Sequence, residues 1–165
     1  MKARLYGYFG HGNLGDEAIQ EAWRRAVPSL RRAHVQAPPR LPRGRGVTLF
    51  AGGILQDRSS VRSLIFYSAA LGVAARGGPC GLAAVGVDVQ SRAGRLVLSR
   101  AVPKADFASA RDPKSYRELA DVGAKPREAR DVALTLSAPR HQGGGPVLVN
   151  LTPAVPPAVR HAVLS

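Results

Sequence analysis

Short apolar runs alternate with stretches of helical periodicity from residue 4 to residue 136. The runs with the length and composition of strands are 4–9, 33–37, 47–50, 79–87, 107–110 and 131–136. The segments in which apolar residues recur at helical spacing start at Asp16 and at residues 60, 94 and 113. This alternation predicts an α/β fold, a doubly wound Rossmann-like parallel sheet with helices on both faces.

Local signals place the ends of these helices. Asp16 is suited to cap the first helix and Glu17 to lie in its first turn. The second helix is expected over 60–76, with Leu64, Ile65, Ala69 and Leu71 facing the core. The third spans 94–102. The last, 113–121, starts with proline and is followed by glycine at 123, which is the usual asymmetry of helix ends.

The composition changes after the last predicted strand. Residues 137–145 are rich in Gly, Ser and Pro and read as a linker, after which 146–151 has a strand pattern and 156–164 a helical one. We therefore expect one Rossmann-like amino-terminal domain over 1–136, a linker over 137–145, and in 146–165 the start of a second domain that the 165-residue chain does not complete.

Two glycine-rich segments follow predicted strands. They are Gly10-His11-Gly12-Asn13-Leu14-Gly15-Asp16-Glu17 and Gly52-Gly53-Ile54-Leu55-Gln56-Asp57. Ligands of open α/β sheets bind at the carboxyl ends of strands, and glycine lets a ligand or another backbone approach closely. Asp16 and Glu17 would repel a phosphate, so the first segment favours sugar hydroxyls or an internal loop contact. The alternative is a tight turn needed only for packing.

Two further side chains are candidates for chemistry. Arg111 follows the strand of 107–110, where its guanidinium could hold a carboxylate or a phosphate through two parallel hydrogen bonds. The alternative is a contact with Asp112 or with backbone that only fixes the loop. His11 is the one histidine placed to meet a substrate, as a general acid or base. The four histidines have no metal-ligand spacing, so no metal is predicted.

Charge and composition narrow the partners. The chain has 24 Lys plus Arg against 11 Asp plus Glu, a net charge of +13, which favours anionic partners such as phosphorylated substrates and acidic lipids. The same abundance of Arg, Ala, Gly and Pro also fits a GC-rich coding bias. No aromatic residues interleave the arginines near the first helix, so nucleic acid is not expected as a partner.

The cysteine content and the hydropathy bear on where in the cell the protein is expected. Cys80 is the sole cysteine, which excludes an intrachain disulfide and suggests a thiol buried in a strand. No stretch approaches the roughly 20 apolar residues that a spanning helix needs. We expect a cytoplasmic protein with peripheral contact to the inner face of the membrane; the sequence leaves its oligomeric state open.

Three motifs together resemble one family. The segment from Tyr6 to Ala18, the segment 52–57 followed by Arg62-Ser63-Leu64, and Ala110-Arg111-Asp112 followed by Ser115 resemble, in order, the signatures of polysaccharide pyruvyl transferases. The similarity is greatest to the bacterial enzymes that pyruvylate a secondary cell-wall polysaccharide to which surface-layer proteins bind. Two positions depart from the pattern: Ala51 replaces a glycine, and 86–89 replaces a Gly-Ile-Gly-Pro stretch.

The resemblance implies a two-domain fold like that of GT-B glycosyltransferases. The implied donor substrate is phosphoenolpyruvate, with no cofactor, and the implied acceptor is N-acetylmannosamine on a lipid-diphosphate carrier. Arg111 matches the arginine that the family uses toward the donor. The residues implied on the acceptor side are Tyr8, Gly10, Gly12, Asn13, Gly15, Asp16, Glu17, Gly52, Gly53, Gln56 and Asp57.

The family also places donor-binding His and basic residues in a carboxyl-terminal domain. The 165-residue chain is therefore expected to be incomplete and inactive alone. Two alternatives stay open at this point: a non-catalytic glycan-binding module, and half of a GT-B-like glycosyltransferase that uses a nucleotide sugar.

Overall fold

The computed structural model describes residues 3–30, 34–58 and 60–136. In these ranges a six-stranded parallel sheet runs in the order β2-β1-β3-β5-β7-β8. Its strands are β1 (Ala3–Tyr6), β2 (His34–Gln36), β3 (Val47–Phe50), β5 (Cys80–Val85), β7 (Phe107–Ala110) and β8 (Arg127–Glu128). A two-stranded parallel sheet pairs β4 (Leu55–Gln56) with β6 (Val87–Asp88).

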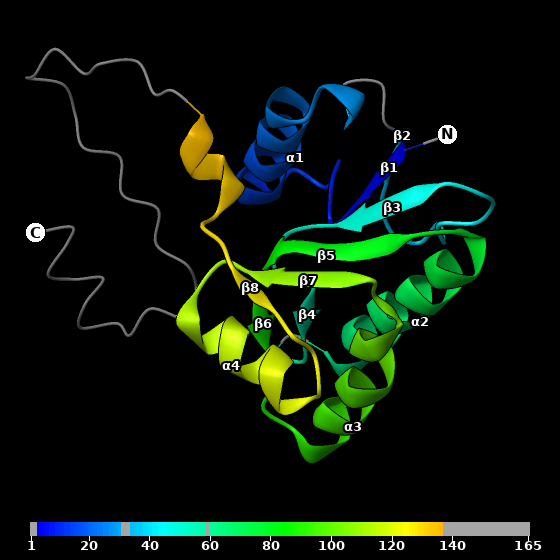
Figure 1. The fold of residues 1–165 in the computed structure, drawn as a ribbon, viewed down its shortest axis with the longest axis vertical. Coiled ribbons are helices and arrows are strands. Elements are labelled where there is room, and N and C mark those ends of the chain that lie inside the picture. The colour runs from blue at the N-terminus through cyan, green and yellow to red at the C-terminus, as the bar shows by residue number, and fades with distance from the viewer. Residues whose placement is uncertain (1–2, 31–33, 59, 137–165) are drawn as a thin grey trace, which may run out of the picture.

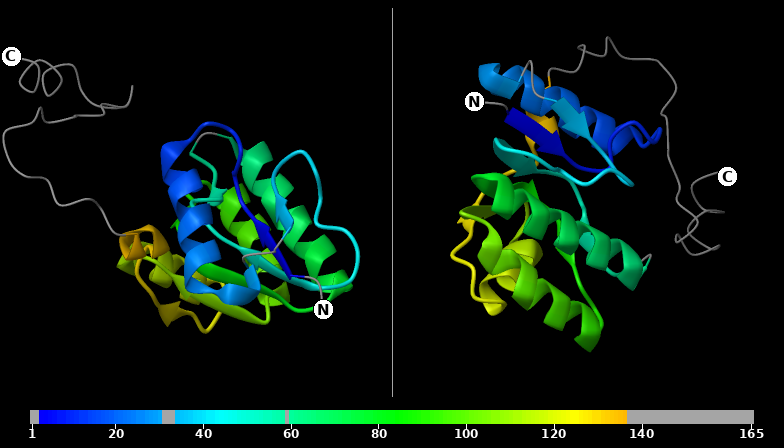
Figure 2. Two further views of the ribbon diagram at one scale, coloured as in Figure 1. Left: turned by 90° about the horizontal axis from the view of Figure 1, so that it is seen from above. Right: turned by 90° about the vertical axis from the view of Figure 1, so that its right-hand side faces the viewer.

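Helices cover both faces of the large sheet, as the alternating pattern predicts. They are α1 (Leu14–Ala26), α2 (Val61–Gly77), α3 (Arg92–Ala101) and α4 (Pro113–Asp121). Short 3-10 turns are η1 (Pro28–Leu30), η2 (Val102–Lys104) and η3 (Val132–Thr135). Helix α1 lies on one face with η3 beside it, and α2, α3 and α4 lie on the other (Figure 1). The right-hand view of Figure 2 shows the same separation from the side. The doubly wound α/β fold is confirmed.

The order of the strands reverses between β1 and β3. From β1 the chain crosses through α1 to β2 on one side, whereas from β3 it crosses through α2 to β5 on the other. In doubly wound sheets the crevice outside the carboxyl ends of two such strands is where ligands bind. Both glycine-rich segments begin at this reversal, because one follows β1 and the other follows β3.

Two apolar clusters hold the helices to the sheet. The larger lies between the sheet and helices α2, α3 and α4, and includes Leu64, Leu71, Leu82 and Leu98. The smaller joins β1 to α1 and η3 through residues such as Leu5 and Ile19. All six residues of β5 are buried, as befits a central strand of a parallel sheet.

The thiol of Cys80 lies in the larger cluster. Burial raises the pKa of this thiol, and the charge of Asp106 adds to the rise. A buried thiol kept in its protonated form is a structural residue, as the flanking sequence indicates.

Two predictions about helices are wrong. Helix α1 begins at Leu14, and its cap is Asn13, whose side chain accepts a hydrogen bond from the Gly15 N–H at 3.1 Å; Asp16 lies in the first turn instead. In α2, Ile65 and Ala69 are exposed. The helix turns Tyr67, Ser68 and Ala70 inward in their place.

The run 131–136 does not form a strand. Asp131 accepts a hydrogen bond from the Ala133 N–H at 3.0 Å and so caps the 3-10 turn η3, which packs on α1. The edge strand is β8, which consists of two exposed residues earlier in the chain. Both are polar, so a search for apolar runs does not find them.

Two predicted strands are shorter in the structure. Strand β1 ends at Tyr6, and the run 79–87 divides into β5 and β6 at Gly86. Ala84 adopts a left-handed conformation with φ of 50°, where the pairing of β5 with β7 shifts register. The Ala84 N–H donates to the Ser109 hydroxyl at 2.8 Å, which satisfies the irregular backbone. The predicted linker at 137–145 and the segment 146–165 lie outside the described residues.

Replacing Leu82 by alanine should strongly destabilise the fold. Leu82 is fully buried in β5, so Leu82→Ala should lower the free energy of unfolding by about 2–5 kcal/mol, measured by urea denaturation. Leu96→Ala is the matched control, because that leucine is 53% exposed on α3 and its loss should cost less than about 0.5 kcal/mol. Equal losses in the two variants would contradict the assignment of β5 to the core.

Candidate functional site

A cleft of about 660 Å³ opens where the carboxyl ends of β1, β3 and β7 meet. Its lining residues are Tyr8, Asn13, Gly15, Asp16, Ala18, Ile19, Gly53, Ile54, Gln56, Ser63, Tyr67, Arg111, Asp131 and Ala133. The predicted site residues among them are Tyr8, Asn13, Gly15, Asp16, Gly53, Gln56 and Arg111. The fold thus brings together residues from all three sequence motifs.

The guanidinium of Arg111 lies directly against the backbone of two glycines. A Cβ at Gly86 would stand 2.7 Å from Nη2 and 3.0 Å from Cζ of Arg111, and one at Gly53 would stand 3.4 Å from Nη2. The Arg111 N–H also donates to the Val85 carbonyl at 3.2 Å, which ties the end of β7 to β5. The position of the cation therefore depends on glycine at 86, between β5 and β6, whereas Gly53 only borders it.

Arg111 pairs with Asp131, a residue 20 positions along the chain. Its Nη1 donates to Oδ2 of Asp131 at 2.8 Å, and each side chain is 31% exposed. The alternative contact, between the side chains of Arg111 and Asp112, is not formed in the described residues. Asp112 instead caps α4 by accepting hydrogen bonds from the N–H and the hydroxyl of Ser115. A guanidinium has five N–H donors, so the pair with Asp131 leaves donor capacity toward an anion in the cleft.

Asp16 lies opposite Arg111 with its carboxylate against Gly52. A Cβ at Gly52, whose φ is 94°, would stand 3.0 Å from Oδ1 of Asp16. Burial raises the pKa of Asp16, and the charges of Glu17 and Asp131 add to the rise, while Arg111 and His11 oppose it. Asp16 is therefore a carboxyl group with an enhanced tendency to hold a proton, beside a fixed cation.

Tyr8 and His11 stack on each other at the rim of the cleft. Their ring centroids are 4.2 Å apart, the planes are inclined by 12°, and Tyr8 is 43% exposed. Tyr8 lines the cleft, whereas His11 lines a separate hollow beyond it. The structure does not bring His11 into the cleft that holds Arg111.

The remaining residues of the first motif shape the loop. Oε1 of Glu17 accepts a hydrogen bond from the Gly10 N–H at 2.5 Å, and this closes the turn between β1 and α1. Gly10 and Gly12 have φ values of 75° and 73°, a backbone conformation that other residues rarely adopt. None of these three residues lines the cleft.

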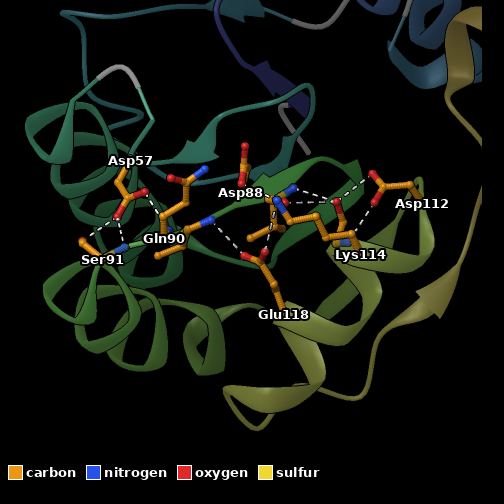
Figure 3. Close-up of polar contacts among 10 residues, drawn as sticks. Asp57, Asp88, Gln90, Ser91, Asp112, Lys114 and Glu118 are labelled. Atoms are coloured by element: carbon orange, nitrogen blue, oxygen red, sulfur yellow. Dashed lines mark hydrogen bonds and ion pairs between the residues drawn. The ribbon is translucent and has the colours of Figure 1, made fainter.

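Asp57 is likewise held away from the cleft. Its carboxylate accepts hydrogen bonds from the N–H groups of Gln90 and Ser91, each at 2.9 Å, and from the Ser91 hydroxyl at 2.5 Å (Figure 3). Burial alone would raise the pKa of Asp57, but these hydrogen bonds outweigh it and the pKa is lowered. Asp57 therefore fixes the start of α3, whereas its neighbour Gln56 lines the cleft.

Sequence reasoning missed several lining residues. Tyr67 is 4% exposed, and within the described chain its buried hydroxyl has no hydrogen-bond partner. Ser63 and Tyr67 are four residues apart on α2, so they share one face of that helix. This spacing could have predicted that both residues face the cleft. Nothing in the sequence pointed to Asp131, because it precedes an apolar run that resembles a strand.

A second hollow, of about 320 Å³, lies on the other side of Arg111. Its cationic lining residues are Arg58, Arg111 and Lys114. Lys114 pairs with Asp88 and, at 3.7 Å, with Glu118 (Figure 3). Asp88 and Asp112 also line this hollow, so Arg111 stands between a cleft lined with hydroxyl, amide and carboxyl groups and a hollow in which three cations accompany two carboxylates.

The described ranges contain neither a metal-binding cluster nor a membrane-spanning helix. There, no three side chains of His, Cys, Asp or Glu gather in a group that could hold a metal ion. No helix in the same ranges combines the length and the apolar character needed to cross a membrane.

Comparison with known proteins identifies one family. The family model described as "Polysaccharide pyruvyl transferase" matches residues 13–149, which is most of the chain. Comparisons with curated proteins and with solved structures gave no significant match. The matched range contains Asn13, Asp16, Gln56 and Arg111, but begins after the Tyr8–His11 stack.

Replacing Gly86 by alanine should displace Arg111. The added Cβ would overlap the guanidinium, so Gly86→Ala should break the pair with Asp131 and cost about 1–3 kcal/mol of stability. The measurement is the Arg111 Nε–Hε resonance in NMR spectra, together with urea denaturation. Gly72→Ala is the control, since its Cβ would meet only the flexible end of Lys104. An unmoved Arg111 resonance in Gly86→Ala would contradict the glycine cradle.

Asp16 should make the fold less stable as its carboxyl ionises. Its folded-state pKa is raised above the unfolded value of about 3.9. Stability is therefore highest below that value and falls as the pH rises through the folded pKa. Asp16→Asn removes this titration, so its stability relative to the unaltered chain should increase over the same interval. Urea denaturation at a series of pH values measures the difference; a constant difference would contradict the raised pKa.

Proposed function

The chain belongs to the polysaccharide pyruvyl transferase family, and on that premise we propose that it transfers a pyruvyl group from phosphoenolpyruvate, as a ketal, onto a sugar of a cell-wall polysaccharide precursor. The observation that carries the proposal is the guanidinium of Arg111, which two glycines hold in the same cleft as the carboxyl of Asp16. A fixed cation and a carboxyl whose pKa is raised are two elements that this chemistry can use.

Arg111 is the proposed donor-binding residue. Phosphoenolpyruvate carries a carboxylate and a phosphate on one carbon, so its two anionic groups cannot both lie beside Asp16 without repulsion. We place one group beside Arg58 and Lys114, in the hollow that Asp88 and Asp112 also line, while the reacting carbon stays near Arg111 at the edge of the main cleft. The planar fork of Arg111 can bind either oxyanion through two hydrogen bonds.

The main cleft is the proposed acceptor site. Tyr8, Asn13 and Gln56 present hydroxyl and amide groups that exchange hydrogen bonds with sugar hydroxyls. The exposed ring of Tyr8 offers a flat apolar surface for the carbon face of a sugar. The buried hydroxyl of Tyr67 has no partner within the described chain, so a sugar hydroxyl that reached it would relieve the cost of its burial.

Ketal formation requires two new C–O bonds at the same carbon. One sugar hydroxyl adds to C2 of the donor as C3 gains a proton, and a second hydroxyl then forms a bond to C2 as phosphate leaves. The proton lost by the first hydroxyl balances the one that C3 gains, and the proton of the second leaves with phosphate. We assign the transfer of these protons to Asp16, because its carboxyl lines the cleft together with Arg111 and burial raises its pKa.

The finer identity of the substrate follows the family resemblance. We propose N-acetylmannosamine on a lipid-diphosphate carrier as the acceptor, handled by a cytoplasmic protein at the inner face of the membrane. The net charge of +13 supports an encounter with an anionic carrier and acidic headgroups. The proposal also includes a second, GT-B-like domain that contributes further donor-binding residues to the complete site.

Loss of Arg111 should weaken the binding of phosphoenolpyruvate. Calorimetric titration into the chain should show affinity falling at least about tenfold in Arg111→Ala, a change of about 1.4 kcal/mol. Arg111→Lys should recover only part of it, because an ammonium lacks the planar fork. Arg100→Ala, an exposed residue of α3, is the control for charge alone.

One result would count against the role of Arg111, and two others against the transferase. Equal affinities of the unaltered chain and Arg111→Ala would remove Arg111 from the donor site. A chain that ignores phosphoenolpyruvate but binds a nucleotide sugar such as UDP-N-acetylglucosamine would instead be a glycosyltransferase half. One that binds only the saccharide would be a glycan-binding module.

A further inference from the structure

We infer that the hollow at the carboxyl end of β2 is a second saccharide subsite, which takes the sugar next to the one that is pyruvylated. The inference rests on the proposed function, because it extends the acceptor site. The hollow has a volume of about 450 Å³ and is lined by Phe9, Gly10, His11, Gln20, Val35, Ala37, Pro38, Pro39 and Arg40. Neither the proposed donor site nor the proposed acceptor site uses it.

The hollow adjoins the main cleft across the Tyr8–His11 stack. Strands β1 and β2 are parallel neighbours, so the loops that follow them lie at the same edge of the sheet. Tyr8 faces the main cleft and His11 the hollow, with 4.2 Å between their ring centroids. The exposed Tyr8–His11 stack is therefore the boundary that a saccharide occupying both hollows would cross.

The lining of the hollow combines apolar surface with polar groups, and a sugar needs both. Phe9, Val35, Pro38 and Pro39 give it apolar surface for the C–H face of a pyranose ring. Gln20, Arg40 and His11 lie among them with donor and acceptor groups for hydroxyls. Few polar groups placed on an otherwise apolar surface is the usual composition of a small-ligand site.

Both walls of the hollow are held by hydrogen bonds to the core or within their loops. The buried Tyr6 donates its hydroxyl to the Arg40 carbonyl at 2.7 Å, and the Arg40 N–H donates to the Ala37 carbonyl at 3.1 Å. On the opposite wall, Glu17 fixes Gly10. Because the walls are fixed before binding, little ordering cost remains for a ligand.

The hollow has few charged side chains. Arg40 is the single Lys or Arg among its lining residues, and no Asp or Glu is present there. The hollow beside Lys114 and Arg58, by contrast, is lined by three cations and by the carboxylates of Asp88 and Asp112. Along the carboxyl edge of the sheet, the order is therefore anionic donor, reacting sugar, and adjoining sugar.

The test is an NMR titration of the ¹⁵N-labelled chain with saccharides of two lengths. The probes are N-acetylmannosamine and a β-linked disaccharide whose non-reducing sugar is N-acetylmannosamine, with phosphoenolpyruvate titrated separately. The monosaccharide should shift the amides of Tyr8, Asn13 and Asp16. The disaccharide should in addition shift those of Gln20 and Arg40, and should bind at least about tenfold more tightly.

Substitutions in the hollow should remove only the advantage of the longer ligand. Gln20→Ala and Arg40→Ala should bring the disaccharide affinity down toward that of the monosaccharide, whose own affinity stays unchanged. Gln90→Ala is the matched control, because that exposed glutamine lines none of the three hollows described. Well-dispersed spectra of each variant establish that it folds.

The outcomes separate this inference from the proposed function. If phosphoenolpyruvate and the monosaccharide bind but the disaccharide gains nothing, the subsite is overturned and the transferase stands. If phosphoenolpyruvate fails to bind while the disaccharide still depends on Gln20 and Arg40, the subsite stands and the transferase falls. If no saccharide shifts Gln20 or Arg40, the hollow is not a sugar site, whatever the donor does.

Discussion

The site depends on one steric constraint, which is the contact of the Arg111 guanidinium with glycine backbone. Gly53 lies between β3 and β4 and Gly86 between β5 and β6, and a side chain on Gly86 would overlap the guanidinium. Gly52 makes the equivalent space for the carboxyl of Asp16. Charged groups can lie flat on the edge of the sheet only because these glycines leave room, so the glycine-rich motifs shape the site without binding a phosphate themselves.

This constraint sets the electrostatics of the cleft. Arg111 faces Asp131 at 2.8 Å and has Asp16 within electrostatic reach, so one cation serves two carboxyl groups. Asp131 satisfies part of the cation's charge, and the burial of Asp16 then outweighs the remaining attraction and raises its pKa. On its other side Arg111 lines a hollow with Arg58 and Lys114, where Lys114 pairs with Asp88. Carboxylates therefore accompany the cations on both sides of the guanidinium.

The sequence predicted the doubly wound sheet and the meeting of three motifs, because parallel strands place the loops that follow them at one edge. It did not predict that Asp131 would pair with Arg111, since an apolar run after an aspartate resembles a strand until its docking against α1 is known. Nor could it separate Asp16 from Asn13 as the helix cap, because both residue types cap well. Local pattern places elements, whereas these contacts depend on how elements far apart in the chain pack.

Each motif ends in a pair of adjacent residues with divided roles. Asp16, Gln56 and Arg111 line the cleft. The acidic residue that follows each of them fixes a loop: Glu17 binds the Gly10 N–H, Asp57 binds the turn before α3, and Asp112 caps α4. Because the locking residue is covalently next to the cleft residue, each loop is fixed within one residue of the group that it presents. The polar side chains that line the cleft are thus each next to a residue that fixes the loop. Residue type alone does not reveal which acidic residue lines the cleft and which one fixes a loop.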